Sequence, residues 1–455
     1  MDAILLLFLT GILSLFLGMK NKPVLNLCLN LVGLLSAGLL MGFHGTYEPL
    51  LKSFSETLVF EGEKTLVSHS AIALILFTAL IQLASFSKEK NDQSTYGDLN
   101  ALMIFALCGG LILLGATDYF MFFLGVEILS IPVYVLVGSK KNTTFAAEGA
   151  LKYFFMGSLA TAIMLMGIAL TYGAVGHFNL DLTSSPKPAN AFYPEILLPV
   201  GSLLILGSVL FKLGGFPFHF WNPDIYQASS KNVLGFMVSI VKISVFVAAF
   251  KLFNTAFKNM GDTWNLALSF VIIGSVLVGY LSALNQTSLK RMVSFTGISS
   301  TGFALLTLLP NENASYNGLL IYLIPYVAAT LMLLFISMSI DAKDDHLKSF
   351  EGVGYQNPIL GFFGLVAILS LMGIPPLSGF FGKLLILQDT FKAHHWLGLF
   401  GLLSSIFGAF VYLRLLLIFF KKSEGSSSIP LQSNIVFSLI VCTLIAMGGW
   451  IWVLF

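Results

Sequence analysis

The stretch "LGSVLFKLGGFPFHFWNPD", residues 206–224, begins as an apolar membrane helix, carries a lysine in its apolar run and then breaks. Pro217 lacks a backbone N–H and its ring clashes with the carbonyl four residues earlier, so a helix cannot continue unbroken through it. Gly214 and Gly215 permit backbone angles that other residues resist. A break at membrane depth is tolerated only where it is buried in protein or lines a wet cavity. The stretch therefore predicts an internal path beside Lys212.

The composition of the whole chain is that of an integral membrane protein. Of its 455 residues, 56% are hydrophobic and only 10% are charged, whereas a soluble domain has about 25% charged residues. A membrane span needs about 20 mostly apolar residues. Fourteen such runs are present, at 2–19, 24–43, 68–86, 99–116, 119–138, 145–173, 195–215, 231–250, 264–285, 291–309, 316–340, 358–388, 396–420 and 432–454. We expect a single all-α polytopic domain with no room for a nucleotide-binding or other soluble catalytic domain, because the longest polar stretch is only about 44–67.

A second broken span repeats the pattern of the first. The stretch "SLMGIPPLSGFFGKLLIL", residues 370–387, places glycines and a proline pair in mid-membrane and then Lys383. Spans 7 and 12 are thus both predicted to be discontinuous, and each is the fourth span of a five-span unit, 4–8 or 9–13. Because five is odd, the two units enter the membrane from opposite sides, and paired interrupted spans of this kind mark a transport site near the midplane. The expected divisions are spans 1–3 at 1–98, the first repeat at 99–255, the second at 264–420 and the last span at 421–455.

The basic residues of the connections predict the orientation of the chain. Thirteen lie after odd-numbered spans, namely Lys20, Lys22, Lys88, Lys90, Lys140, Lys141, Lys231, Lys290, Arg291, Lys343, Lys348, Lys421 and Lys422. Six lie after even-numbered spans, namely Lys52, Lys64, Lys187, Lys251, Lys258 and Lys392. Because cytoplasmic connections carry the excess of lysine and arginine, we expect both chain ends on the outer side.

Five basic residues that are not counted among the connections fall inside the predicted spans, and Glu127 lies on span 5; the five are Lys152, Lys212, Lys242, Lys383 and Arg414. Each costs about 2.5–3.5 kcal/mol at a span centre, or roughly 15–21 kcal/mol for the set, if it is exposed to lipid. We therefore expect them to face one another or water, although Arg414 is close enough to the end of its span to reach the surface. Burial favours the neutral amine of a lysine and a nearby carboxylate favours the charged form. A lysine that alternately gains and loses a partner such as Glu127 would load and release a proton, which arginine cannot do.

The chain itself offers no cofactor or metal site. Cys28, Cys108 and Cys442 lie singly in three different apolar runs, without the paired spacing that metal or cluster ligation needs. P-loop, GxGxxG, HExxH and CxxC patterns are absent from the sequence. Any cofactors must therefore sit on partners.

Five stretches together resemble a known family. They are "FFLGVEILSIPVYVLVG" (122–138), "EGALKYFFMGSLATAIMLMGIALTYG" (148–173), "FKLGGFPFHFWNPDIYQ" (211–227), "NQTSLKRMVSFTGISSTGF" (285–303) and "GIPPLSGFFGK" (373–383). In this order they resemble the antiporter-like membrane subunits that respiratory complex I, the NADH-quinone oxidoreductase, shares with the Mrp cation/proton antiporters. The run from Glu127 to Gly173 favours the subunit N family among them. The likeness extends over nearly the whole chain.

The resemblance implies a fold of fourteen spans with two inverted repeats, and a path for protons. In it Glu127 faces Lys212, Lys152 stands nearby on span 6, Lys242 bridges the two halves on span 8, and Lys383 is the terminal residue on span 12. NADH, FMN, iron-sulfur clusters and quinone are implied on partner subunits only. The partners implied are the other membrane subunits and the peripheral arm of the complex, in the cell inner membrane.

One departure from the family pattern concerns span 10. The family often reads "SIAHMGY" there, whereas Ser300 stands where the histidine is common. Water held by Ser299, Ser300 and Thr301 is a candidate bridge between the lysines of the two halves. His219, beside the first break, either relays protons or holds freed carbonyls.

Structural interpretations compete for several of these residues. The lysines on spans 7 and 8 could form ion pairs that only fix helix packing. Pro132 could kink and hydrate the helix around Glu127 without any transport, and Glu148 lies four residues before Lys152, a spacing that stabilises helices. Three functions are therefore compared: a proton-translocating subunit of complex I, an Mrp-type sodium/proton antiporter subunit, and a non-catalytic scaffold.

Overall fold

The computed structural model describes residues 2–20, 22–42, 64–86, 93–140, 143–180, 194–256, 261–309, 316–340, 345–421 and 431–454. Its helices are α1 (Asp2–Met19), α2 (Pro23–Gly42), α4 (Lys64–Phe86), α5 (Gln93–Gly115), α6 (Tyr119–Val137), α7 (Thr144–Val175), α8 (Pro194–Leu213), α9 (Trp221–Ala228), α10 (Lys231–Phe236), the π-helix η1 (Met237–Val241), α11 (Lys242–Thr255), α12 (Gly261–Leu284), α13 (Leu289–Ala304), the 3₁₀ turn η2 (Leu305–Leu308), α14 (Tyr316–Ser339), the 3₁₀ turn η3 (Leu347–Phe350), α15 (Val353–Gln356), α16 (Pro358–Met372), α17 (Ser378–Ala393), α18 (His395–Phe419) and α19 (Ser433–Leu454).

Every predicted span coincides with helix in the described residues. Eleven helical segments are long and apolar enough to cross a membrane, with 231–255 taken as one segment. The other three predicted spans are α13 with η2, the pair α16 and α17, and α19. The polytopic all-α fold is therefore confirmed. Eight of the lysines that predict orientation lie outside the described residues, namely Lys52, Lys88, Lys90, Lys141, Lys187, Lys258, Lys343 and Lys422.

Both predicted breaks are present. Span 7 stops at the end of α8, passes Gly214 with φ 66°, and resumes as α9. Span 12 stops at the end of α16, passes Gly373 with φ 80°, and resumes as α17. A positive φ is readily adopted only by glycine, so these residues end the first half-helix in each case. A third irregularity was not predicted: span 8 contains the π-helical turn η1 immediately before Lys242.

The same backbone connection occurs once in each five-span unit. In both units the residue before the second helix forms an isolated bridge with the segment after the third helix, Asp118 with Asn179 and Ser288 with His346. The flanking hydrogen bonds are Tyr119 N to Phe178 O (2.9 Å), Leu180 N to Thr117 O (3.1 Å), Leu289 N to Asp345 O (2.8 Å) and Leu347 N to Thr287 O (2.7 Å). Because five helices separate the two connections, they lie at opposite ends of the molecule, as the inverted repeat requires.

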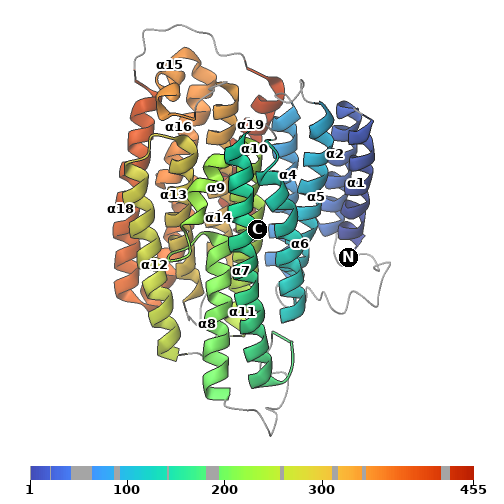
Figure 1. The fold of residues 1–455 in the computed structure, drawn as a ribbon. Coiled ribbons are helices and arrows are strands. Elements are labelled where there is room, and N and C mark those ends of the chain that lie inside the picture. Colours follow the sequence, from blue (N-terminus) through green and yellow to red (C-terminus); the bar gives the residue numbers. More distant parts are fainter. Residues whose placement is uncertain are drawn as a thin grey trace.

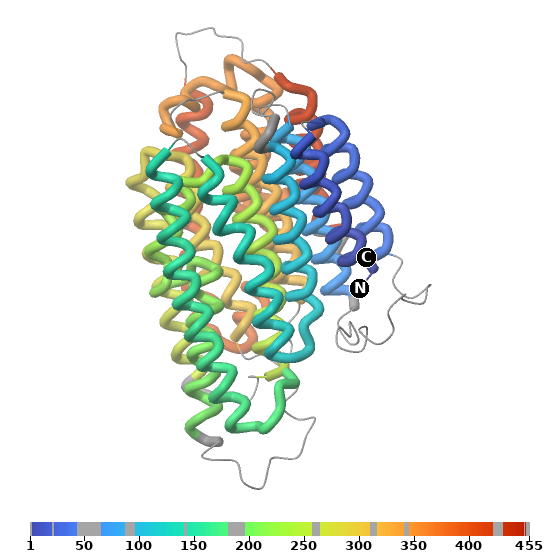
Figure 2. The backbone as a smooth tube through the Cα atoms, turned by 45° about the vertical axis from the view of Figure 1, so that its right-hand side comes forward, coloured from blue at the N-terminus to red at the C-terminus, as the bar shows by residue number. Residues whose placement is uncertain are grey.

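The centre of the molecule is formed by the segment 231–255 and by α14, whose apolar windows are fully buried inside the chain. Figure 1 shows α1 and α2 at one flank and α18 at the other. The tube in Figure 2 shows that the start of α1 and the end of α19 lie at the same end of the bundle. Only a third of the apolar windows of α7 and α18 is buried. Lys242, at the start of α11, therefore lies in the buried centre of the bundle.

Helices α12 and α13 approach so closely that a side chain at Gly279 has no space. A Cβ there would lie 2.6 Å from the Ser299 nitrogen and 2.7 Å from the Phe295 oxygen, both backbone atoms. We expect Gly279→Ala to force the helices apart and to lower the stability of the fold by about 1–3 kcal/mol. The matched control is Gly448→Ala, because a Cβ there meets nothing within 4 Å. Thermal unfolding in detergent should show a lower midpoint for Gly279→Ala only; equal midpoints would contradict this packing.

Candidate functional site

The charged residues of the spans fall into two groups. Lys212, Lys242 and Lys383 are buried, with 4%, 6% and 8% of their surface exposed. Lys152 is not buried, because 49% of its side chain is exposed and its Nζ lies 2.7 Å from Glu148 Oε1 and 4.0 Å from Asp224. The structure thus buries three lysines inside the bundle and leaves the fourth partly exposed on α7.

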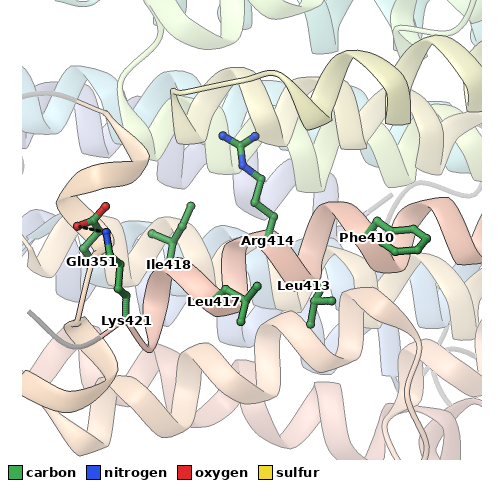
Figure 3. A pocket seen from close by; sticks show the side chains of 7 residues that line it. All are labelled: Glu351, Phe410, Leu413, Arg414, Leu417, Ile418 and Lys421. Carbon is green, nitrogen blue, oxygen red and sulfur yellow. Dashed lines mark hydrogen bonds and ion pairs between the residues drawn. The ribbon is translucent and has the colours of Figure 1, made fainter.

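Arg414 belongs to neither group, because its side chain contacts the end of a neighbouring helix. Its Nη1 donates a hydrogen bond to the carbonyl of Leu284, the last residue of α12. Figure 3 shows the guanidinium reaching toward that helix end. A cation is favourable there, because the carbonyl end of a helix carries partial negative charge. Arg414 therefore stabilises the surface end of α12 and does not contact the buried lysines.

Lys212 lies in the last turn of α8 and binds two hydroxyls of α6. Its Nζ donates to Ser130 Oγ at 2.7 Å and to Tyr134 OH at 2.7 Å. The amine also lies 5.1 Å from the centre of the Tyr134 ring, within range of a cation–π interaction. Both partners are neutral, so the structure holds Lys212 by polar contacts that carry no countercharge.

Glu127 lies on the same face of α6, one turn before Ser130. Its Oε1 accepts a hydrogen bond from Thr161 Oγ1 of α7 at 2.7 Å. No ion pair joins Glu127 to Lys212 among the described residues, although the family resemblance places the two face to face. Residues at positions i, i+3 and i+7 share one helix face, so the glutamate and the two hydroxyls form one polar stripe toward α8.

The free carbonyls at the first break are satisfied by residues from both repeats. Gly215 N donates to Leu210 O at 2.8 Å, and Trp221 Nε1 donates to Phe211 O at 3.0 Å. The carbonyl of Leu213 accepts from Thr301 Oγ1 of α13 at 3.0 Å. A hydroxyl of the second repeat thus completes the break of the first, directly beside Lys212.

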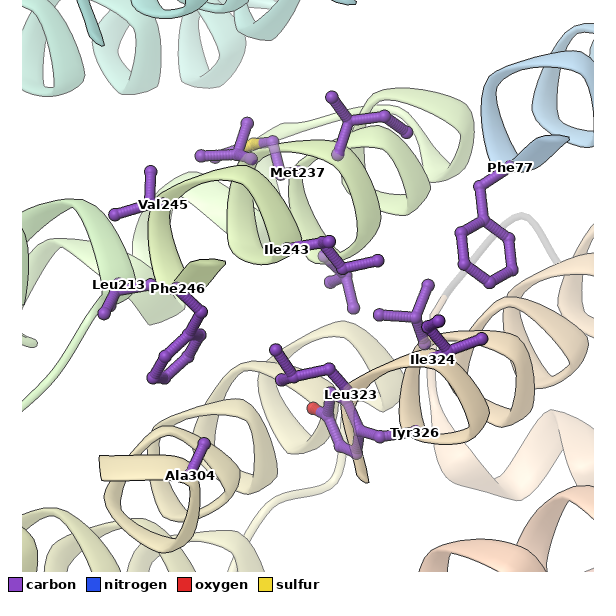
Figure 4. Packing of buried hydrophobic residues seen from close by; sticks show 14 of the residues in the cluster. Phe77, Leu213, Met237, Ile243, Val245, Phe246, Ala304, Leu323, Ile324 and Tyr326 are labelled. Atoms are coloured by element: carbon purple, nitrogen blue, oxygen red, sulfur yellow. The ribbon is translucent and has the colours of Figure 1, made fainter. Parts of the chain in front are cut away.

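Lys242 binds α13 of the second repeat. Its Nζ donates to Gly297 O at 2.7 Å and to Ser300 Oγ at 2.6 Å, and it lies 4.8 Å from the centre of the Tyr326 ring. Figure 4 shows apolar side chains of α11 and α14 facing one another, with the ring of Tyr326 among them. The π-helical turn η1 precedes Lys242, and π-bulges frequently occur at functional sites.

The three hydroxyl residues of α13 have different contacts. Ser300 binds Lys242, and Thr301 binds the carbonyl next to Lys212. Ser299 instead donates to Phe295 O at 3.4 Å and packs against α12 at Gly279. Ser300 and Thr301 therefore connect the surroundings of the two lysines. Ser300 contacts the amine of Lys242, and Thr301 contacts the Leu213 carbonyl beside Lys212.

Lys383 folds back across the second break. Its Nζ donates to Leu371 O at 3.1 Å and to Met372 O at 2.9 Å, the last two carbonyls of α16. Lys212 precedes its break whereas Lys383 follows its own, so the two lysines do not occupy equivalent positions in the repeats. We call Lys212, Lys242 and Lys383 together the lysine seam.

His219 lies within the first break but apart from the lysine seam. It is 5% exposed, and its ring centre lies 5.7 Å from that of Phe216 and 4.3 Å from that of Phe220. Among the described contacts none joins it to Lys212. The cysteines Cys28, Cys108 and Cys442 are free thiols, and no group of three metal-binding side chains gathers within the described ranges.

The sequence did not reveal a second buried cluster, at the surface end of the second repeat. Lys290 is 2% exposed, and its Nζ donates to Ser229 O at 2.7 Å and pairs with Asp345 Oδ2 at 2.9 Å. Lys231 lies 3.8 Å from the other oxygen of Asp345 and donates to Ser337 O at 2.7 Å. Both lysines were counted as connection residues by charge alone. Asp345 thus links the ends of α9 and α14 through two lysines.

We expect Asp345→Asn to weaken this link, because a neutral amide replaces the partner of a buried ammonium. The loss should be about 1.5–3 kcal/mol in the free energy of unfolding, the range for hydrogen bonds to charged groups. Asp389→Asn is the control, since its pair with Lys392 is 3.8 Å long, Lys392 is 54% exposed, and an exposed pair contributes about 0–1 kcal/mol. The midpoint of thermal unfolding measures both. An equal shift for the two variants would contradict the assignment.

Comparison with known proteins supports the resemblance stated from the sequence. The sequence model of the family described as NADH:quinone oxidoreductase/Mrp antiporter, transmembrane, matches residues 116–408. The chain is 33% identical to NADH-quinone oxidoreductase subunit N of Cytophaga hutchinsonii, over 94% of this chain and 92% of the relative. It is 31% identical to subunit N of Flavobacterium psychrophilum, over 98% of each.

Solved structures share the fold. A chain of respiratory complex I from Thermus thermophilus matches with a TM-score of 0.83 and 26% identity, covering 98% of this chain and 96% of that one. A chain of the Mrp complex from Dietzia sp. matches with a TM-score of 0.81 at 17% identity, which shows a common fold alone; it covers 99% of this chain and 94% of that one. With its two broken spans, its inverted repeats and these matches along nearly its whole length, the chain belongs to the NADH:quinone oxidoreductase/Mrp antiporter family of membrane proteins.

Proposed function

We propose that the chain is a proton-translocating membrane subunit of NADH-quinone oxidoreductase, in which electron transfer on partner subunits drives protons along the lysine seam. The observation that carries the proposal is the set of hydrogen-bond partners of the three lysines. Each is buried, and each donates only to hydroxyl or carbonyl oxygens in the described part of the chain. In these contacts none of the three amines pairs with a carboxylate, so a carboxylate that approaches would change the preferred charge state of the amine.

In this proposal Lys212 loads and releases a proton by changing partners. Glu127 lies on the polar stripe of α6 that also carries Ser130 and Tyr134, so a side-chain rotation exchanges hydroxyl partners for a carboxylate. An approaching carboxylate favours the ammonium and its departure favours the neutral amine. Moving one charge through the membrane potential takes about 2.3 kcal/mol per 100 mV, which is less than the energy available to a buried ion pair.

Lys242 carries the proton between the repeats in this account. It belongs to the first repeat but donates to α13 of the second, where Ser300 occupies the place of the family's usual histidine. A hydroxyl both donates and accepts, so Ser300 passes a proton on without storing charge. Lys383 then takes the proton at the second break. We propose 99–255 and 264–420 as the two transfer units, flanked by 1–98 and 421–455.

Two further residues lie at the edge of the proposed path. Lys152 forms an i,i+4 pair with Glu148 on the outer surface of α7, which suits either proton entry from a neighbouring subunit or simple helix stabilisation. His219 packs between two phenylalanines beside the break. In this proposal Lys152 and His219 both belong to the edge of the path.

The proposal also specifies the surroundings of the chain. NADH, FMN, iron-sulfur clusters and quinone are held by partner subunits, among them the peripheral arm and the other membrane subunits. The chain lies in the cell inner membrane with both ends on the periplasmic side, because the connections after odd-numbered spans carry the excess of lysine and arginine.

Purification in mild detergent tests the proposed function. We expect the intact assembly to bring flavin-containing partners with it and to oxidise NADH with quinone as acceptor. The Mrp-type alternative predicts co-purification with small hydrophobic subunits only, and sodium-for-proton exchange without NADH. Mass analysis of the assembly distinguishes the two, and the second outcome would overturn the proposal.

A further inference from the structure

A groove on the outward surface of α18 combines apolar and basic side chains. It has a volume of about 420 Å³ and is lined by Glu351, Phe410, Leu413, Arg414, Leu417, Ile418 and Lys421. Phe410, Leu413 and Leu417 are 59%, 40% and 66% exposed and lie on one side of the helix. The volume is within the range of about 300–1,000 Å³ that small-molecule sites occupy. Figure 3 shows the charged and apolar side chains along the same helix.

The position of the groove along the helix gives it a polar end and an apolar end. Arg414 reaches the end of α12, and Lys421 follows the end of α18, so both cations lie where helices leave the membrane. Glu351, between η3 and α15, lies at the same end, since the neighbouring Gly352 N donates to Ile418 O at 3.3 Å. Leu413 and Phe410 continue from there along α18 toward the bilayer interior. A molecule in the groove meets charge at one end and hydrocarbon at the other.

The charged end carries an excess of positive charge. Lys421 Nζ lies 3.3 Å from Glu351 Oε2, and this is a largely exposed pair, with 62% of the lysine side chain accessible. Arg414 uses one N–H on the Leu284 carbonyl and keeps further donors. A planar guanidinium matches phosphate oxygens in a two-pronged arrangement. Two cations against one carboxylate therefore favour an anionic phosphate.

We propose that this groove binds an anionic phospholipid of the surrounding leaflet, such as a phosphatidylglycerol. The phosphate lies between Arg414 and Lys421, and an acyl chain lies along Leu417, Leu413 and Phe410. A zwitterionic headgroup would bring a third cation to the site, which the existing cations disfavour. A free phosphate would make no contact with the apolar side chains that line the groove. Each basic residue near an anionic leaflet contributes about 1 kcal/mol, or roughly fivefold in affinity.

Photo-crosslinking in the assembled complex tests the proposal. The probes are phosphatidylglycerol and phosphatidylcholine with the same diazirine-bearing acyl chain, supplied in vesicles of otherwise identical composition. Mass spectrometry quantifies adducts on residues 410–421. We expect several-fold more adduct from phosphatidylglycerol than from phosphatidylcholine, and no competition from inorganic phosphate. Equal labelling by the two lipids, no adduct on this segment, or displacement by phosphate would overturn the proposal.

Two variants separate charge from shape. Lys421→Gln should lower labelling by phosphatidylglycerol about fivefold and leave phosphatidylcholine unchanged. Leu417→Trp fills the apolar end and should lower labelling by both lipids. The control is Lys140→Gln, an exposed lysine at the end of another odd-numbered span, outside the groove. An equal loss for Lys140→Gln and Lys421→Gln would show surface charge attraction alone and contradict a site. Arg414→Gln is avoided, because it also leaves the end of α12 without its partner.

Discussion

Lys212→Met is expected to reduce NADH-driven proton pumping by about 10²-fold or more, the usual effect of removing a group that transfers protons, while the complex still assembles. Methionine has a similar length and no charge, so it occupies the same volume. The partners that lose the amine are Ser130 and Tyr134, and Ser130 Oγ still donates to the carbonyl of Val126. The fold should therefore tolerate the change. Pumping is measured as acidification of sealed vesicles that contain the purified complex.

The companion variant Lys212→Arg separates charge from proton exchange. Arginine keeps the positive charge but does not release its proton in proteins. We expect Lys212→Arg to be as inactive as Lys212→Met. The matched control is Lys140→Met, an exposed lysine outside the bundle centre, which should pump normally. Normal pumping by Lys212→Arg would mean that only the charge matters, and normal pumping by Lys212→Met would support the scaffold alternative.

Lys383→Met is expected to impair both pumping and stability. The amine of Lys383 is a donor to two carbonyls at the end of α16. Each buried carbonyl that loses its partner costs about 1–3 kcal/mol, so the variant should unfold at a clearly lower temperature than Lys212→Met. Pumping should fall as well, since among the residues that the structure describes Lys383 is the lysine that contacts the second break. The measurements are the thermal midpoint in detergent and vesicle acidification.

Lys383→Arg distinguishes the two effects. The guanidinium supplies donors to the same carbonyls and should recover most of the lost stability, whereas pumping should remain low because the proton is not released. Lys392→Met on the same helix is the control, since that side chain is 54% exposed in a 3.8 Å pair. Restored pumping in Lys383→Arg would contradict a proton-carrying role for Lys383.

The breaks and the buried lysines were predictable because they depend on strong local rules. A proline removes an N–H wherever it stands and a glycine at membrane depth permits a positive φ. A lysine at the centre of a span is favoured inside the bundle, because its exposure to lipid costs about 2.5–3.5 kcal/mol. Gly214 and Gly373 and the placement of the lysine seam follow from these rules alone. Span counting was equally direct, because the bilayer thickness fixes the length of each apolar run.

The partners of the lysines were not predictable, because helix rotation decides them. Glu127, Ser130 and Tyr134 share one face of α6, so their spacing cannot say which of them meets Lys212, and the structure selects the two hydroxyls. The direction of Lys383 depends on how the chain folds back at its break. For Lys152 the resemblance implied a place on the path, but the helix turns it outward to Glu148.

The sequence also could not predict which lysines at the ends of spans are buried. The rule that counts basic residues in connections gives orientation, but it does not say whether a lysine is exposed. Lys290 is buried because the end of α9 leaves the carbonyl of Ser229 in need of a donor at the start of α13, and because the carboxylate of Asp345 lies beside it. The π-helical turn before Lys242 has no composition signal, because its residues are ordinary apolar ones and serine.

The most direct test of the lysine seam is the number of protons pumped per NADH oxidised by Lys242→Met, because Lys242 is the member of the seam whose amine binds the other repeat. The matched control is Lys251→Met, at the other end of the same helix. We predict that Lys242→Met, in normally assembled complex in sealed vesicles, pumps fewer protons per NADH than the wild type, while Lys251→Met keeps the wild-type ratio. An unchanged ratio and rate in Lys242→Met would contradict transfer through the centre of this chain.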